Sequence, residues 1–234
     1  MATIAANIQQ VRARIAAACA AAQRPVQSVT LLAVSKTFGA DAVRAAVDAG
    51  ETRFGENYVQ EGVDKIGALS DVRGRIEWHL IGPLQSNKTR IVAEHFDWVH
   101  SVDRLKTAQR LSEQRPTHLP PLQLCLQVNI SGEESKSGVV PTDLPALAHA
   151  VARLPRVRLR GLMAIPEPAE SLDAQRRPHA ALRRLLQHLQ ADGLALDTLS
   201  MGMTADLEAA ILEGATIVRV GTAIFGSRTT SVSG

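Results

Sequence analysis

Eight short apolar runs alternate with longer segments of helical periodicity, and this alternation restricts the fold more than any other feature of the chain. The runs expected to form strands are VTLLAVS (29–35), TRFG (52–55), IEWHLIG (76–82), DWVHSV (97–102), LQLCLQVNI (122–130), VRLRGLMAI (157–165), LDTLSMG (196–202) and TIVRVG (216–221). The segments expected to form helices lie between them, at 40–49, 57–69, 84–94, 103–114, 142–153, 173–191 and 204–213. This order is typical of a parallel sheet, and the nearly continuous apolar runs indicate strands buried on both faces.

One more helix is predicted before the first strand. Apolar residues recur at three- and four-residue steps up to Pro25, at Ile4, Ile8, Val11, Ile15 and Cys19. Eight strands, with this helix filling the eighth position of the outer ring, close most simply into a barrel. The predicted fold class is therefore α/β, a (β/α)8 TIM-type barrel with an additional N-terminal helix. A doubly wound open sheet is the alternative, because periodicity does not show whether a sheet closes.

The length of 234 residues suits one barrel domain, since such barrels are typically about 250 residues long. We find no linker, repeat or low-complexity segment that would mark a second domain. The chain ends in small and polar residues. We therefore predict a single barrel domain over 1–228 and a flexible tail over 229–234.

Charge and cysteine content argue against several classes of protein. The net charge is only +3, and the arginine groups at 153–160 and 176–184 are not interleaved with aromatic residues, which favours solvated helix faces over a nucleic-acid surface. Cys19 and Cys125 lie far apart in apolar segments, so we expect buried thiols, no disulfide and no metal site. The chain shows neither a signal peptide nor an apolar run of about 18 residues, so we expect a soluble, cytoplasmic protein without membrane contact.

In a barrel of this class the active site forms at the carboxyl ends of the strands. Lys36 directly follows the first predicted strand, and it shares strand parity with Leu32 and Val34. A strand that points Val34 into the barrel therefore points Lys36 there as well. A lysine amine in such a position can attack an aldehyde to form an imine. The alternative is a lysine that simply extends to solvent at the rim.

The last two strands are followed by small and hydroxyl-bearing residues. Ser200 and Gly202 follow the seventh strand, and Gly221 and Thr222 follow the eighth. Glycine lets backbone approach a ligand closely, and Thr222 can begin a short helix whose free N–H groups attract an anion. Barrels of this class frequently bind phosphate at these two loops, so we predict a phosphate site here. Ordinary loop residues are the alternative.

Three other polar residues allow two interpretations each. Arg219 interrupts an apolar strand, so its guanidinium needs a partner: either a carboxylate such as Glu208 or Glu213, or a ligand. His79 could be a ligand contact or a core histidine whose hydrogen bonds are satisfied. Asn57 could face a ligand or act as N-cap of the following helix.

Several of these segments together resemble one known family. The segments are LLAVSKT (31–37), RFGENYVQEGVDK (53–65), WHLIGPLQSNK (78–88), NISGEESKSG (129–138), RGLMAIP (160–166), SMGM (200–203) and VRVGTAIFG (218–226). In order and spacing they resemble the pyridoxal phosphate homeostasis protein family (YggS/PROSC-like). The likeness extends from the first strand to Phe225. The chain differs from some relatives at Phe38, where they carry a further basic residue, and its 167–180 segment is divergent.

The resemblance implies a barrel like the N-terminal domain of alanine racemase, with pyridoxal 5′-phosphate (PLP) held as a covalent Schiff base on Lys36. It places phosphate contacts at Ser200, Gly221 and Thr222 and puts Arg219 opposite the pyridine nitrogen. Asn57 and Met163 fall where the family lines the cofactor. Lys136 is either a second attachment point or a simple exposed lysine, and we favour the latter.

The family resemblance also implies a function without established turnover. Such a protein buffers or delivers PLP and contributes to intracellular PLP and amino-acid/keto-acid homeostasis, with PLP-dependent apoenzymes as possible partners. We expect a monomer. Two alternatives stay open: a racemase- or lyase-like PLP enzyme, and a phosphate-binding barrel enzyme without PLP. Tyr58 is the only tyrosine, and no second domain is evident to supply another base, which argues against a two-base racemase.

Overall fold

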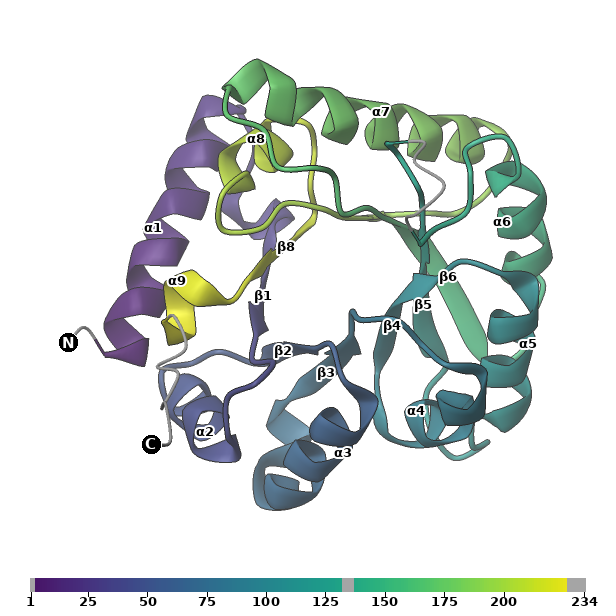
Figure 1. Cartoon of the computed structure of the whole chain (residues 1–234), viewed down its shortest axis with the longest axis horizontal. Helices are drawn as coiled ribbons and strands as arrows, with labels where there is room; N and C mark the ends of the chain where they lie inside the picture. The colour runs from purple at the N-terminus through teal and green to yellow at the C-terminus, as the bar shows by residue number, and fades with distance from the viewer. Residues whose placement is uncertain (1–2, 132–136, 227–234) are drawn as a thin grey trace, which may run out of the picture.

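Eight parallel strands close into a barrel in the computed structural model, which describes residues 3–131 and 137–226 (Figure 1). The strands are β1 (Thr30–Val34), β2 (Arg53–Glu56), β3 (Glu77–Leu80), β4 (Trp98–Val102), β5 (Leu122–Gln127), β6 (Val157–Met163), β7 (Thr198–Ser200) and β8 (Ile217–Val220). Each strand pairs with the next, and β8 returns to β1 through the register Thr30↔Ile217 to Ala33↔Val220. The predicted (β/α)8 barrel is confirmed, and the open sheet is excluded.

Helices form the outer ring. They are α1 (Ile4–Ala21), α2 (Ala40–Asp48), α3 (Val59–Ala68), α4 (Thr89–His95), α5 (Leu105–Gln114), α6 (Leu144–Ala152), α7 (Leu172–Ala191), α8 (Leu207–Leu212) and the one-turn α9 (Thr222–Phe225). Short 3₁₀ helices cover Val26–Ser28, Ser70–Arg75 and Ser86–Lys88. Helix α1 packs against α2, α8 and α9, at the position in the ring predicted for the N-terminal helix (Figure 1).

The barrel has two separate apolar cores. The larger one lies between the strands and the helices, and α1 contributes Ile8, Val11 and Ile15 to it. The smaller one fills the lumen and includes Leu32 and Val34 of β1. Because side chains alternate between the two faces of a strand, this confirms the predicted parity of β1 and aims Lys36 at the mouth of the lumen.

Six of the eight predicted strands extend beyond the observed strands at their carboxyl ends, whereas β4 ends as predicted and β2 one residue later. Val128, Ala164 and Met201 follow β5, β6 and β7 and are all buried. All three belong to the larger core described above, and their N–H groups still donate to carbonyl oxygens of the neighbouring strands, so the apolar runs continue as far as the extended backbone does. The helix predicted at 84–94 is also shorter, since Ser86–Lys88 is 3₁₀ and α4 begins at Thr89.

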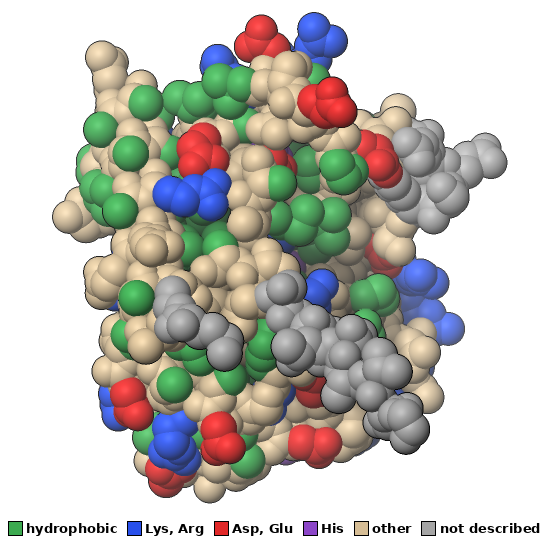
Figure 2. Space-filling model, turned by 60° about the vertical axis from the view of Figure 1, so that its left-hand side comes forward, with side chains coloured by type: hydrophobic (Ala, Val, Ile, Leu, Met, Phe, Trp, Pro, Cys, Tyr) green, Lys and Arg blue, Asp and Glu red, His purple; other side chains and the backbone are tan. Residues whose placement is uncertain are grey.

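Several charged side chains on the surface form ion pairs. Arg176 and Arg183 of α7 both contact Glu213, and Arg160 binds Asp197. On the face in Figure 2, basic and acidic side chains are interspersed, with no broad area of one sign. This agrees with the interpretation of the arginine groups as solvated faces. Among the described residues, no helix combines the length and apolar character needed to cross a bilayer.

Gly161 in β6 provides a test of how closely the strands pack. A Cβ atom there would lie 1.8 Å from the carbonyl oxygen of Thr198 on β7. We predict that Gly161→Ala lowers the free energy of unfolding in urea by about 1–3 kcal/mol, because backbone would have to move. Gly67→Ala in α3 is the matched control, since a Cβ atom at that position would meet nothing within 4 Å; it should raise stability by about 0.5–1 kcal/mol. Equal effects at the two positions would contradict the prediction.

Candidate functional site

A cavity of about 370 Å³ opens at the carboxyl ends of β1, β2 and β8. It is lined by Val34, Lys36, Asn57, Ile81, Ile165, Met203, Thr204, Ala205, Arg219, Gly221 and Thr222. Five of the seven residues predicted for the site therefore meet here: Lys36, Asn57, Arg219, Gly221 and Thr222. They come from segments far apart in the sequence, and the closure of β1 on β8 brings them together.

Lys36 is exposed and lies in a tight turn after β1. The N–H of Phe38 donates to the carbonyl oxygen of Ser35 at 3.1 Å, which closes the turn around Lys36 and Thr37. Thr37 has φ of 69°, in the left-handed region that β-branched residues rarely adopt. Such a conformation persists only where neighbouring groups hold it in place. The lysine is therefore presented from a constrained turn at the cavity wall.

A buried ionic network holds this turn from below. The Lys65 amine of α3 donates to the carbonyl oxygen of Ser35 at 2.7 Å, to Glu56 at 2.8 Å and to Glu61 at 2.7 Å. Glu61 also accepts from the N–H of Thr37. Burial raises the pKa of Glu56, although the hydrogen bonds from Lys65 and Ser35 lower it in part. Sequence reasoning missed this network. Its signal is the Glu61–Lys65 spacing of four residues together with an acidic residue at the end of an apolar strand.

The cavity wall next to Lys36 is suited to an anion. Thr222 is the first residue of α9, as predicted, and the first N–H groups of a helix have no acceptor within it. The Thr222 hydroxyl lies 3.3 Å from the hydroxyl of Thr204, which enters the cavity from the loop after β7. At Gly221 a Cβ would come within 3.1 Å of the Val34 carbonyl oxygen. Thr204 is a second site residue that sequence reasoning missed, because its position depends on the path of that loop.

Arg219 is 3% exposed and extends from β8 to the cavity. Its guanidinium donates to the Ser200 carbonyl oxygen at 2.6 Å, to the Ser200 hydroxyl at 2.8 Å and to the Ala164 carbonyl oxygen at 2.8 Å. Burial lowers the pKa of Arg219 to about 10, so the group is still charged at neutral pH.

The carboxylate partners considered for Arg219 are not its partners. Glu208 binds Arg14, and Glu213 binds Arg176 and Arg183. Both glutamates belong to the outer layer, whereas Arg219 points inward, and backbone carbonyls satisfy its donors instead.

Met163 and Ser200 lie deeper than the cavity surface. Met163 belongs to the apolar cluster in the lumen. The hydroxyl of Ser200 is fully buried, accepts from Arg219 and bonds to a ring nitrogen of His100. A direct phosphate contact by Ser200 stays a prediction. In this structure its hydroxyl accepts a hydrogen bond from Arg219.

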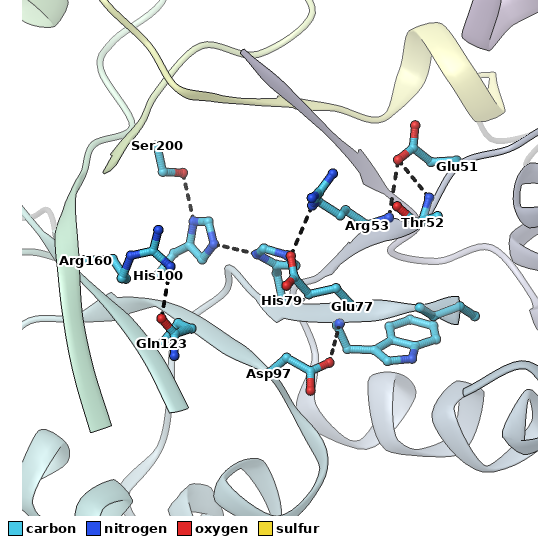
Figure 3. Close-up of polar contacts among 12 residues, drawn as sticks. Glu51, Thr52, Arg53, Glu77, His79, Asp97, His100, Gln123, Arg160 and Ser200 are labelled. Carbon is cyan, nitrogen blue, oxygen red and sulfur yellow. Dashed lines mark hydrogen bonds and ion pairs between the residues drawn. The ribbon is translucent and has the colours of Figure 1, made fainter. Parts of the chain in front are cut away.

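Two of the open interpretations are resolved by local contacts. His79 is a core histidine with both ring nitrogens bonded, one to His100 and one to Glu77 (Figure 3). Asn57 is not the N-cap of α3, since that position belongs to Tyr58 and Asn57 lines the cavity. Lys136 lies outside the described residues. Phe38, where the sequence departs from some relatives, stacks on Phe225 with ring centroids 5.2 Å apart.

Comparisons with known proteins agree on one family. Residues 2–229 match the family model described as "Alanine racemase, N-terminal domain". The chain is 64% identical over 228 residues to the pyridoxal phosphate homeostasis protein of Pseudomonas aeruginosa, with 97% of each chain covered. It is 55% identical over 227 residues to the protein of the same name from Escherichia coli K12, with 96% of this chain and 97% of that one covered.

Solved structures also superpose on most of the chain. The structure of PipY from Synechococcus elongatus with PLP bound superposes with a TM-score of 0.83 at 39% identity, covering 96% of this chain and all of that one. An alanine racemase from Corynebacterium glutamicum superposes with a TM-score of 0.64 at 19% identity, over 87% of this chain and 58% of that one. The second likeness is one of fold alone.

The buried network under the Lys36 turn can be tested by substitution. We predict that Lys65→Met lowers the free energy of unfolding by about 3–5 kcal/mol, because it leaves Glu56 buried without its cation. Chemical denaturation at pH 7 would measure the change. Arg44→Met removes a cation from an exposed ion pair with Asp71 and is expected to change stability little. A Lys65→Met protein as stable as the Arg44→Met protein would show that the network does not hold the turn.

Proposed function

We propose, since this chain belongs to the pyridoxal phosphate homeostasis protein family, that it binds PLP in the cavity around Lys36 and buffers or delivers the cofactor. One observation carries the proposal: an amine, an anion-accepting helix start and a buried guanidinium line the same cavity. They are supplied by Lys36, Thr222 and Arg219.

The residues present fit this cofactor. When bound, PLP supplies an aldehyde that condenses with an amine with loss of water, and a phosphate group that carries negative charge. Lys36 offers the amine, as the covalent attachment point. Thr222, Thr204 and the first N–H groups of α9 offer donors to the phosphate. Arg219 offers donors to a ring nitrogen, and Asn57 and Ile81 complete the wall.

The character of Arg219 favours a carrier over a catalyst. PLP chemistry on amino acids relies on the ring as an electron sink. A guanidinium only donates hydrogen bonds, so Arg219 does not keep a proton on a ring nitrogen opposite it. A two-base racemase also needs a second acid–base group beside Lys36. Tyr58 is 58% exposed, and its hydroxyl has no partner among the described residues to orient it.

The openness of the site also supports exchange of the cofactor. Lys36 is exposed, and the cavity continues into a neighbouring hollow lined by Thr37, Phe38 and Tyr58. We propose that PLP enters and leaves by this side and that PLP-dependent apoenzymes receive it. A monomeric state and a cytoplasmic location stay predictions from the sequence.

Substitution of Lys36 tests the proposed PLP attachment point directly. We predict that the wild-type protein mixed with PLP gains an absorbance band typical of an imine, and that borohydride reduction fixes a pyridoxyl group on the peptide containing Lys36. Lys36→Ala should lose both signals because the attacking amine is gone. Lys106→Ala, which removes an exposed lysine on α5, should retain them. A reduced label found on another lysine, or on none, would move or remove the proposed site.

The phosphate-binding wall can be tested with two ligands. Thr222→Val and Thr204→Val should each weaken PLP binding by about 10- to 100-fold, since a hydrogen bond to a charged group is worth about 1.5–3 kcal/mol. Binding of pyridoxal, which lacks the phosphate, should be the same in the variants and the wild type. Ser200→Ala serves as a comparison for the phosphate contact that the family resemblance implies. Equal losses for both ligands would place the phosphate elsewhere.

A further inference from the structure

A continuous line of hydrogen bonds runs through the lumen from Arg219 toward the opposite mouth of the barrel. Arg219 donates to the Ser200 hydroxyl at 2.8 Å, and that hydroxyl lies 2.8 Å from Nδ1 of His100. Nε2 of His100 lies 2.9 Å from Nδ1 of His79, and Nε2 of His79 lies 3.0 Å from the carboxylate of Glu77. Figure 3 shows the line from Ser200 to Glu77. We call Ser200, His100, His79 and Glu77 the polar column.

The groups at the two ends of the column determine which partner donates in each of its hydrogen bonds. A guanidinium has no acceptor, so at one end Ser200 must accept from Arg219. Glu77 is an acceptor at the other end: burial by itself raises its pKa, but its interactions with His79 and the charge of Arg53 outweigh this and hold the pKa below its ordinary value. His79 must therefore carry its proton on Nε2.

The donor and acceptor of each inner hydrogen bond then follow from those of its neighbour. Burial lowers the pKa of His79 and of His100, so both rings are neutral at pH 7 and each carries one N–H. With Nε2 of His79 protonated, its Nδ1 accepts from Nε2 of His100. Nδ1 of His100 then accepts from the Ser200 hydroxyl. Every donor points from Arg219 toward Glu77, and a column polarised in one sense is strengthened along its length.

The two ends of the column lie at opposite mouths of the barrel. Ser200 ends β7 beneath the cavity, whereas Glu77 begins β3 and lines a hollow at the amino ends of the strands. His79 and His100 are completely buried between them, and Trp98 stacks on His79 with ring centroids 5.2 Å apart. The buried charge of Arg219 is thus connected to a carboxylate through three neutral side chains.

We propose that the polar column positions Arg219 from the far mouth of the barrel, so that Glu77 controls how the guanidinium meets a ring nitrogen in the cavity. The inference rests on the proposed function for its effect on PLP. The existence of the column does not depend on that function, because all of its hydrogen bonds lie within this chain. Glu77 and the two histidines are positioning residues, since none of them lines the cavity at Lys36.

The first experiment needs no ligand. Long-range ¹H–¹⁵N spectra of the protein at pH 7, assigned with His79→Gln and His100→Gln, should show both histidines neutral with the proton on Nε2. In Glu77→Gln the terminal group can donate as well as accept, so both rings should gain a share of the Nδ1-protonated form. Asp197→Asn is the matched control: it removes an equal charge from the same hollow but touches Arg160 and Thr198, outside the column. Its spectra should match the wild type.

The second experiment adds PLP to the same proteins. Glu77→Gln should weaken PLP binding by about 5- to 10-fold and shift the absorbance band, because the Ser200 hydroxyl, one of the three acceptors of Arg219, is then no longer fixed in direction. Asp197→Asn should leave both unchanged, and Glu77→Asp, which keeps the charge, should recover part of the affinity. Thermal melts of each variant identify any loss that is due to unfolding.

The outcomes separate the two proposals. Imidazolium signals, Nδ1 protonation in the wild type, or spectra of Glu77→Gln identical to the wild type would overturn the column. Wild-type binding of PLP with no difference between Glu77→Gln and Asp197→Asn would overturn its role at Arg219. A wild-type protein that does not bind PLP would defeat the proposed function and the role at Arg219, while the ligand-free spectra would still test the column.

Discussion

The hydrogen-bonded closure of β8 on β1 is the constraint on which the rest of the structure depends. It sets the register Ala33↔Val220, and Lys36 follows three residues later in the turn after β1, beside the Gly221–Thr222 start of α9. A sheet with the same strand order but without this closure would leave these two strands at opposite edges. The amine and the anion-accepting helix start would then lie far apart, and no single cavity would contain both. The candidate site is therefore a direct product of the closed topology.

Buried charge lies on both sides of the strands around that site. Lys65 and Glu56 lie under the Lys36 turn, and Arg219 lines the cavity from the lumen with backbone carbonyls as acceptors. Each charge is costly to bury unless its donors are satisfied, so neighbouring groups fix its position closely. A lumen filled only with leucine and valine would be easier to stabilise but would not hold a guanidinium at one defined place.

Much of this could be predicted from sequence because it depends on local periodicity. The two-residue period of β1 indicated the direction of Lys36, and the Gly221–Thr222 pair indicated the start of α9. What could not be predicted depends on loop paths and on partners distant in sequence. Thr204 reaches the cavity because Asp206 fixes the N–H of Met203 in that loop. Arg219 was expected to need a carboxylate or a ligand, but carbonyls of two other strand ends satisfy it, and no spacing rule identifies them.

The last strand has a consequence for how the protein is made. During synthesis on the ribosome β1 emerges early, yet one of its edges stays unpaired until β8 has been translated almost two hundred residues later. An unpaired parallel edge is prone to mispairing while it waits. The pocket at Lys36 can form only after that final pairing, so nascent chains are expected to capture no cofactor and ligand binding reports on completed folding.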